Sequence, residues 1–567
     1  MKLWWILLLL VSSAMGAITP SDLIANIPGR TTVSLDGAWH VIVDPFENGL
    51  PRGFFRDAKP RGKNDLVEYS FDASPVLNVP GDWNTQREEL MFYEGPVWYR
   101  REFSYHKKTD SRVFVYFGAA NYRAVVYLNE EKLGEHEGGF TPFNFEVTSE
   151  LHDGANSLIV EVNNTRRADA VPGMRFDWWS YGGLTREVTL VEVPKVFVQD
   201  YSVQLSRGSQ SEISGWVQLN GAQSPQKVTL EIPEIHWHGA FNSDAKGWAK
   251  FSVTAKVELW SPEHPKLYDV ILTSGEDTVR DQIGFRTIEV RGAQILLNGK
   301  PIFLRGISMH EEAPFRGGRA FSAEDAQTLL GWVKELGCNF VRFAHYPHNE
   351  NEIRLADRMG LLVWSEIPVY WDIDWQNPAT LASAQAQLRD MIARDHNRAA
   401  VILWSLSNET PVKPERLTFL KQLAQDAREL DSSRLITSAM NHVDDSGPDV
   451  RTLSDPLGDV VDVLGLNEYL GWYWGRPEDA DKMQLKSSWT KPLIVSEFGG
   501  EAPAGRHGEA DERVPLLQGR ELFVLLAERG KTVRMVTYPG SPHFPTLAEQ
   551  RHDVFVEIGD WLAKYNR

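Results

Sequence analysis

Two glutamates, each placed where an apolar run of strand length ends, are the residues of this sequence best suited to chemistry. Glu409 closes the run 401–408, and Glu497 follows the run 492–496. A parallel strand buried on both faces is a continuous hydrophobic run, and in a β/α barrel the active site lies at the carboxyl ends of such strands. Either glutamate alone is more often an ordinary surface carboxylate. Two together predict a pair of carboxylates over one bond, which is what hydrolysis of a glycosidic bond requires.

Other polar residues collect at the expected ends of neighbouring strands. They are Ser308, His310, Glu311, His345, Glu366, Asn408, Asn467 and Tyr469. A single histidine or asparagine at such a position is more often a structural hydrogen-bonding residue. Their convergence with the two glutamates indicates a site assembled from several strand ends.

The elements that must position these residues begin after residue 291, where strand-like runs alternate with helix-length segments. The alternation predicts βα units and a parallel sheet. The expected strands are 302–307, 339–343, 361–365, 401–406, 435–439, 461–466, 493–496 and 533–537. Helices are expected at 323–336 and 350–359, the second ended by Gly360. Eight such units predict that residues 291–567 form a TIM (β/α)8 barrel.

Two all-β segments precede the barrel, so the fold class is multidomain, β plus α/β. Short alternating runs such as 111–117 and 123–128, broken by Gly, Pro, Asn and Asp, predict a β-sandwich of jelly-roll type over residues 17–193. Residues 194–290, with strands near 201–205, 216–219, 227–232 and 267–272, have the length of one immunoglobulin-like sandwich.

Composition narrows the class of protein. A chain of 567 residues exceeds a single core, and 42% hydrophobic with 24% charged residues is typical of a soluble globular protein. The net charge of −18 argues against nucleic acid as a partner, because phosphates would be repelled. The single cysteine, Cys338, excludes an intrachain disulfide.

The first sixteen residues have the pattern of a secretory signal peptide. Lys2 precedes an apolar run over 3–11, and small residues follow up to Gly16. The run is too short to span a bilayer, and no other stretch is long and apolar enough to do so, so no membrane span is expected after cleavage. Export of a chain without disulfides favours a secreted or periplasmic protein of a bacterium.

Four motifs of the barrel segment resemble the signatures of glycoside hydrolase family 2. They are 305–312 (RGISMHEE), 341–347 (VRFAHYP), 404–409 (WSLSNE) and 496–499 (SEFG). In the first sandwich, 98–101 (WYRR) and 138–143 (GGFTPF) resemble that family's amino-terminal sugar-binding domain. The motifs occur in the expected order between about residues 28 and 506. Asp177 in 176–179 (FDWW) and the segment 467–473 (NEYLGWY) are most similar to the β-glucuronidase branch.

The resemblance implies a retaining exo-β-glycosidase that needs no metal or organic cofactor. In such an enzyme Glu409 is the general acid/base, Glu497 is the nucleophile, and Asn408 holds the sugar 2-hydroxyl. The resemblance also implies substrate-binding or orienting positions at Asp177, His310, Asn467, Tyr469 and Trp472. The partner is a carbohydrate or glycoside, with a β-glucuronide expected first and a β-galactoside as the alternative. Family members commonly assemble, so a homo-oligomer is compatible with the sequence.

The tail from about residue 507 departs from this family. β-Glucuronidases of the family carry a Trp on the eighth strand and, beyond it, an Asn-x-Lys motif that holds the substrate carboxylate, and this tail contains neither feature. Instead the tail resembles the end of a prolyl-oligopeptidase-type α/β-hydrolase, with Asp511 and His543 at that family's triad positions. The sequence contains no Gly-x-Ser-x-Gly elbow, so peptidase chemistry is excluded. Helices at 516–529 and 549–565 around the strand at 533–537 could still complete the barrel.

These departures leave alternatives open. A uronate carboxylate needs a cation, and the candidates are Arg316, Arg319, Arg506, His507 and Arg513, any of which could equally be solvated surface charge. A carbohydrate-binding protein with impaired catalysis is the competing hypothesis, favoured by the altered tail and disfavoured by the two intact glutamates.

Overall fold

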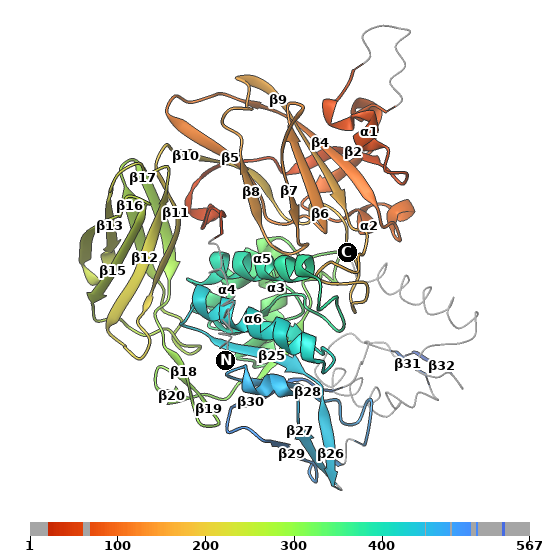
Figure 1. Cartoon of the computed structure of the whole chain (residues 1–567), viewed down its shortest axis with the longest axis vertical. Coiled ribbons are helices and arrows are strands. Elements are labelled where there is room, and N and C mark those ends of the chain that lie inside the picture. The colour runs from red at the N-terminus through yellow and green to blue at the C-terminus, as the bar shows by residue number, and fades with distance from the viewer. Residues whose placement is uncertain are drawn as a thin grey trace, which may run out of the picture.

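The computed structural model describes residues 21–59, 69–447, 449–476 and 479–499, with the backbone of two short strands at 506–508 and 536–538. The predicted signal peptide, the predicted helices at 516–529 and 549–565, and Asp511, Arg513 and His543 lie outside these residues. The described chain forms two β-sandwiches and one α/β part (Figure 1). None of the described helices combines the length and apolar character needed to cross a bilayer.

The first sandwich, at the top of Figure 1, packs a six-stranded sheet against a four-stranded sheet. The larger sheet has the order β3 (Val76–Val79), β2 (Gly37–Val43), β4 (Pro96–Tyr105), β9 (Gly154–Asn163), β6 (Arg123–Leu128) and β7 (Glu131–Glu137). The smaller has the order β1 (Thr31–Ser34), β10 (Val188–Pro194), β5 (Ser111–Phe117) and β8 (Phe143–Glu146). Alternation of buried and exposed residues along β3 shows why such runs form half-buried strands. Two short helices, α1 (Gly49–Arg52) and α2 (Trp83–Gln86), lie in its connections.

The second sandwich also consists of two antiparallel sheets. One has the order β11 (Phe197–Leu205), β12 (Glu212–Asn220) and β15 (Trp248–Thr254). The other has the order β14 (Trp237–Asn242), β13 (Lys227–Ile232), β16 (Tyr268–Ser274) and β17 (Asp277–Ile283). A hairpin-like sheet of β18 (Ile288–Arg291), β19 (Gln294–Leu297) and β20 (Lys300–Pro301) then leads into the barrel.

The α/β part is a parallel sheet that curls into a nearly closed barrel. Its seven described strands are, in sheet order, β21 (Gly306–Met309), β22 (Phe340–Phe343), β23 (Leu362–Glu366), β24 (Val401–Asn408), β25 (Leu435–Met440), β28 (Leu464–Asn467) and β30 (Leu493–Glu497). Ser308 Oγ donates a 3.0 Å hydrogen bond to the Ser496 carbonyl, which brings the first and last strands together. A small sheet of β26 (Val443–Gly447), β27 (Val450–Leu453) and β29 (Gln484–Ser487) projects from the connections around β28.

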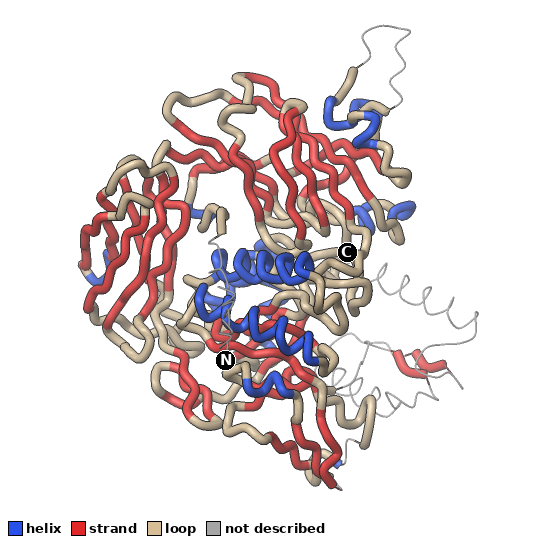
Figure 2. The backbone as a smooth tube through the Cα atoms, in the orientation of Figure 1, coloured by secondary structure: helices blue, strands red, loops and turns tan. Residues whose placement is uncertain are grey.

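Four helices cover the described part of the barrel, as the blue coils of Figure 2 show: α3 (Ala323–Glu335), α4 (Glu350–Met359), α5 (Pro378–Asp395) and α6 (Pro414–Leu430). Local sequence sets their ends. Ser322 and Asp325 form a capping box at the start of α3, and Gly360 ends α4 in the left-handed region at φ 67°. In Figure 1, α5 lies between the barrel and the first sandwich, and Gln387 Nε2 donates to the Val171 carbonyl at 2.7 Å.

The expected eighth barrel strand is not part of this sheet. Residues 533–537 were expected to fill that place, but the strand at this point, β32 (Val536–Tyr538), pairs in parallel with β31 (Arg506–Gly508) as a separate two-stranded ladder. A backbone edge can pair with only one strand, and the paired edge of β32 is occupied by Arg506, His507 and Gly508 of β31. In the barrel sheet β30 pairs with β28. The described barrel therefore joins β30 to β21 by a side-chain hydrogen bond instead of a strand.

Candidate active site

The residues predicted at strand ends meet at the carboxyl edge of the parallel sheet. Glu497 ends β30, Asn467 ends β28, and Asn408 ends β24 directly before Glu409. In the β28–β30 ladder Asn467 is the register partner of Glu497. Because all parallel strands end at one edge, residues far apart in the sequence face one space.

Glu497 is held by Arg342 of β22 and by Tyr469, which lies just after β28. Arg342 Nη1 donates to Glu497 Oε1 at 2.5 Å, and the Tyr469 hydroxyl donates to Oε2. Burial pushes the pKa of Glu497 upward, but Arg342, then His345 and the Tyr469 hydrogen bond outweigh burial, so the pKa lies below the usual value. This carboxylate is ionised at neutral pH.

Arg342 is the centre of the polar network beneath the site. Its buried guanidinium binds both oxygens of Glu366, Nη2 also donates to Asn408 Oδ1 at 2.7 Å, and Nη2 lies 3.2 Å from His345 Nδ1. Burial alone would raise the pKa of Glu366, but Arg342 and His345 hold it at about 2. A bidentate pair of this kind fixes geometry as well as charge.

Glu409 receives hydrogen bonds from two other elements. Trp371 Nε1 donates to Oε2 at 3.1 Å, and Asn467 Nδ2 donates to Oε1 at 3.1 Å. Glu409 itself has φ 49°, the left-handed region that non-glycine residues rarely adopt. Strain of this kind persists where neighbours fix it and is concentrated at functional sites. Here the Glu409 amide donates to the Ala439 carbonyl at 2.8 Å, next to a register irregularity between β24 and β25.

Asn467 and Asn408 connect the two glutamates. Asn467 Nδ2 reaches both Glu409 Oε1 and Asn408 Oδ1 (3.2 Å), while its Oδ1 accepts from Ser496 Oγ at 2.8 Å. Asn408 Nδ2 is buried and has no hydrogen-bond partner within the described part of the chain. A donor left unpaired at this edge of the sheet is ready to bind a hydroxyl.

An aromatic wall borders this network, and the first sandwich contributes to it. The Trp178 ring lies 5.0 Å from Tyr370, 5.9 Å from His345 and 6.2 Å from His310, measured between centroids. Burial and the neighbouring His345 and His348 lower the pKa of His310 to about 3, so its imidazole is neutral. His310 Nδ1 lies 3.3 Å from the Tyr346 hydroxyl.

Asp177 and Trp472, the other two predicted substrate-binding residues, lie around the same space. Asp177 is exposed, and its charge joins those of Glu409 and Glu497 in raising the pKa of the Tyr370 hydroxyl, after the larger effect of burial. Trp472 stacks on Tyr473 at 5.0 Å and meets the Tyr469 ring edge-on at 5.5 Å. The two glutamates, Tyr469 and Tyr370 thus share one electrostatic environment.

Three models of one family cover most of the chain in the order of the observed parts. Residues 32–194 match the model "Glycosyl hydrolases family 2, sugar binding domain", residues 196–286 match "Glycosyl hydrolases family 2", and residues 288–520 match "Glycosyl hydrolases family 2, TIM barrel domain". The chain belongs to glycosyl hydrolase family 2. It is therefore a glycoside hydrolase, and the carboxylate pair lies in the catalytic barrel of that family.

Relatives of this family 2 enzyme match most of its length. A β-glucuronidase of Rattus norvegicus is 29% identical over 560 residues, covering 89% of this chain and 83% of the relative. A β-glucuronidase of Paenibacillus borealis is 27% identical, covering 84% of each chain. Among solved structures, the β-glucuronidase of Ruminococcus gnavus superimposes with a TM-score of 0.75 at 25% identity, covering 92% of this chain and 93% of that one. The same neighbour has been solved in complex with D-glucuronic acid.

The tail matches a different family. Residues 506–567 match a model of the "Prolyl oligopeptidase family", which overlaps the end of the family 2 barrel model at residues 506–520. The change of resemblance predicted near residue 507 thus falls where the second family model begins.

Several functional residues of this family 2 enzyme were not predicted from its sequence. Glu366 was expected at a strand end, but its partner Arg342 was not, although a charged residue inside a buried apolar strand must be paired and so carried a usable signal. Tyr370 and Trp371 lie in an aromatic-rich loop after β23, but their contacts with the site depend on tertiary placement. Trp98 and Tyr99, from the 98–101 motif of the first sandwich, are core residues of β4, each 1% exposed.

Arg316 and Arg319, considered above as cations for a substrate carboxylate, are paired elsewhere. Arg319 forms a buried ion pair with Glu311, and Arg316 binds Asp325 at the start of α3. Glu311 is likewise not at the catalytic edge but in this pairing. The side chains of Arg506 and His507 are outside the described residues, as is Arg513.

The described residues around the two glutamates do not form a cluster of metal ligands. Within the described ranges no three His, Cys, Asp or Glu side chains are grouped to hold an ion. Glu366 and Glu497 are instead occupied by the Arg342 guanidinium.

Proposed function

We propose that this family 2 enzyme hydrolyses terminal β-glucuronides with retention of configuration, using Glu497 as nucleophile and Glu409 as general acid/base. The observation that carries the proposal is the environment of Glu497. Arg342 and Tyr469 hold its carboxylate ionised at the edge of the sheet, as a nucleophile requires. Asn467 joins that carboxylate's strand to Glu409.

The two glutamates would act in two steps. In the first, a Glu497 oxygen attacks the anomeric carbon while the bond to the leaving oxygen breaks, and Glu409 gives its proton to that oxygen. In the second, a water oxygen attacks the same carbon, its proton passes to Glu409, and the bond to Glu497 breaks. Retention in this scheme requires carboxyl groups about 5–5.5 Å apart.

Neighbouring residues would support the charge that develops on the sugar. The unpaired Asn408 Nδ2 suits the 2-hydroxyl, a contact that strengthens as the ring becomes oxocarbenium-like. Neutral His310 and exposed Asp177 would bind other hydroxyls, with Trp178, Tyr469 and Trp472 forming the walls.

The choice of glucuronide rests on relatedness. Relatives of near full-length coverage from Rattus norvegicus and Paenibacillus borealis, and solved neighbours including one with D-glucuronic acid, are β-glucuronidases. The substrate carboxylate still needs a cation. Arg316 and Arg319 are engaged in ion pairs, which leaves Arg506, His507 and Arg513 as the candidates from the sequence.

The test is hydrolysis of nitrophenyl β-glucuronide and nitrophenyl β-galactoside by the full chain, beside Glu497→Gln. We expect turnover of the glucuronide and its loss in Glu497→Gln, because an amide cannot form the glycosyl ester. Proton NMR of the first product formed should show the β anomer. Hydrolysis of the galactoside alone would replace the proposed specificity. Binding without turnover of either sugar by folded protein would instead favour a carbohydrate-binding protein with impaired catalysis.

A further inference from the structure

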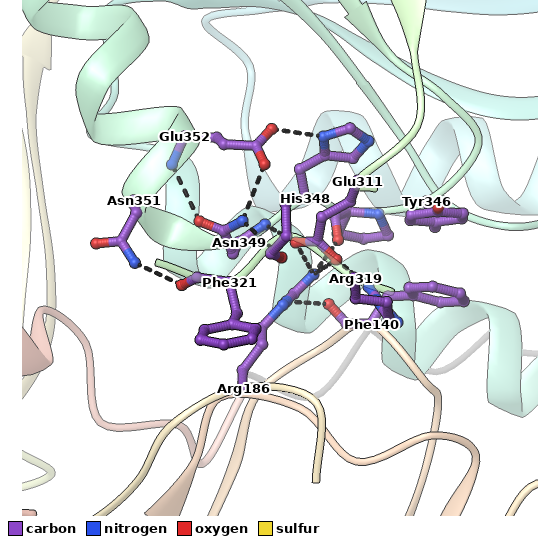
Figure 3. A network of polar contacts seen from close by, with 12 residues as sticks. Phe140, Arg186, Glu311, Arg319, Phe321, Tyr346, His348, Asn349, Asn351 and Glu352 are labelled. Atoms are coloured by element: carbon purple, nitrogen blue, oxygen red, sulfur yellow. Dashed lines mark hydrogen bonds and ion pairs between the residues drawn. The ribbon is translucent and has the colours of Figure 1, made fainter. Parts of the chain in front are cut away.

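Arg186 of the first sandwich enters the barrel and binds two of its loops. Its side chain, 2% exposed, comes from the segment before β10. Nη2 donates to Glu311 Oε1 at 2.9 Å, to Oε2 at 3.2 Å and to the Pro347 carbonyl at 2.7 Å. Figure 3 shows the guanidinium reaching from the sandwich toward this cluster. Nη1 donates to the Phe140 carbonyl at 2.8 Å, within the sandwich.

Glu311 accepts from three directions. Besides Arg186, it binds Arg319, whose guanidinium also lies 4.5 Å from the Phe140 ring centroid, and it accepts from the Asn349 amide at 2.5 Å. Burial alone would raise the pKa of Glu311, but Arg186 and Arg319 lower it to about 2. Figure 3 shows Arg319 and Asn349 converging with Arg186 on this carboxylate.

The cluster is one residue away from the aromatic wall of the site. Glu311 directly follows His310 after β21, and Pro347 directly follows Tyr346 after β22. The Phe140 ring stacks on Tyr346 with centroids 3.9 Å apart. Arg186 therefore binds two loops, one at the residue after His310 and the other at the residue after Tyr346. His310 Nδ1 and the Tyr346 hydroxyl lie 3.3 Å apart.

Stability is a weak explanation for such a cluster. Removing two arginines and a glutamate from water costs several kcal/mol per ion, and apolar substitutes are often as stable or more so. The cost is visible here, because the Nε atoms of Arg186 and Arg319 are buried without a hydrogen-bond partner among the described residues. What an ion cluster supplies and an apolar contact does not is directional bonding that fixes the two loops.

We propose that Arg186 is a positioning residue for catalysis, acting from the sandwich through Glu311 and Pro347 on His310 and Tyr346. The inference rests on the proposed glycosidase function, since its main readout is turnover. Lysine at position 186 keeps the charge but loses the forked donors that bind a carboxylate and a carbonyl together. A displacement of about 1 Å in substrate-positioning groups can lower rates about 100-fold.

The experiment compares Arg186→Lys, Arg186→Ala and Glu311→Gln with a matched control, Arg398→Ala. Arg398 is also buried in an interdomain ion pair, with Asp281 of the second sandwich, and its other partners, Asp357 and the Gln282 carbonyl, lie outside the site. We expect kcat/KM for nitrophenyl β-glucuronide to fall about 10–100-fold in Arg186→Lys. Methylguanidinium should restore part of the activity of Arg186→Ala. Arg398→Ala should keep kcat/KM within about twofold, whatever its effect on stability.

Hydrogen exchange gives a readout that needs no turnover. In Arg186→Lys the segments 306–312 and 344–350 should exchange faster than in wild type, and in Arg398→Ala they should not. Unchanged kcat/KM and unchanged exchange in a folded Arg186→Lys would overturn the inference while leaving the glycosidase intact. An inactive wild type would refute the proposed function, and exchange would still decide the positioning claim. Loss of the fold in all three cluster variants would also overturn it, since the cluster would then serve folding.

Discussion

The ionisation of Glu497 depends on side chains that come from two other strands. Burial at the sheet edge favours its neutral form, and Arg342 contributes most of what reverses this, with His345 and Tyr469 adding to it. Since Arg342 is also bonded to Glu366 and Asn408, it cannot be altered without disturbing both. Tyr469 is the partner whose hydroxyl can be removed alone.

Tyr469→Phe is therefore expected to raise the pKa of Glu497. The hydroxyl stabilises the ionised carboxylate, so its removal favours the protonated, inactive form, and the acid limb of the kcat/KM–pH profile should move to higher pH. A hydrogen bond to a charged group contributes about 1.5–3 kcal/mol, which bounds the shift at roughly one to two pH units. The measurement is kcat/KM between pH 3 and 8.

Tyr346→Phe is the control for that shift. It removes a hydroxyl that lies beside His310, whereas the hydroxyl that binds Glu497 is that of Tyr469. Its rate should change without movement of the acid limb. An acid limb that stays in place in Tyr469→Phe would mean that Tyr469 does not act on the ionisation of Glu497.

At the scale of elements, the chain between Phe340 and Asn408 was largely predictable because pattern and environment agree. Continuous apolar runs became β22, β23 and β24, and the helix at 350–359 was predicted to the residue. Gly360 ends that helix for two reasons: its positive φ, and the Pro262 carbonyl oxygen of the second sandwich, which would lie 2.4 Å from an added Cβ.

Gly360→Ala is expected to destabilise the protein more than Gly337→Ala does. Both glycines follow helices and have positive φ, of 67° and 73°, but nothing lies within 4 Å of a Cβ at Gly337. The left-handed conformation costs alanine about 1–2 kcal/mol at either position. Displacing the Pro262 backbone should add about 1–3 kcal/mol at Gly360 alone. Urea unfolding of both variants measures the difference, and equal midpoints would show that the contact with Pro262 relaxes freely.

The closing strand shows where prediction from sequence ends. A pattern of apolar residues at 533–537 predicts a strand, and β32 is one, but strand pairing is a tertiary property that a local pattern does not encode. The same limit applies to the site. Glu409 and Glu497 could be found from strand-end position, whereas the contact of Trp371 with Glu409 depends on how its loop is placed in the fold.

At the scale of the whole molecule, the candidate site is not the property of the barrel alone. The sandwich supplies Trp178 and Asp177, and it fixes barrel loops through Arg186. The interface therefore has a geometric task in addition to holding two domains together. The effect of a sandwich residue on turnover should depend on how much it contacts barrel residues of the site. It should not depend on the exposure or size of that residue.

Trp178 and Trp179 allow that expectation to be tested on adjacent, identical side chains. Trp178 contacts His310, His345, Tyr346 and Tyr370, all from the barrel. Trp179 is 42% exposed, and among the described residues its ring contacts Phe92 of the same sandwich, with centroids 5.6 Å apart. Trp178→Ala should lower kcat/KM for nitrophenyl β-glucuronide about 10–100-fold, because the histidine wall loses its support.

Trp179→Ala should change the same quantity by less than about threefold, since the ring contact of Trp179 among the described residues is with Phe92 of its own sandwich. Thermal unfolding of both variants separates loss of fold from loss of geometry. Equal effects of the two substitutions on kcat/KM would mean that the loop carrying Asp177 acts as a unit, so that the sandwich would contribute through the position of its backbone and not through the Trp178 ring. A larger effect of Trp178→Ala places the contribution in the ring itself, and it makes the sandwich a structural part of the catalytic centre.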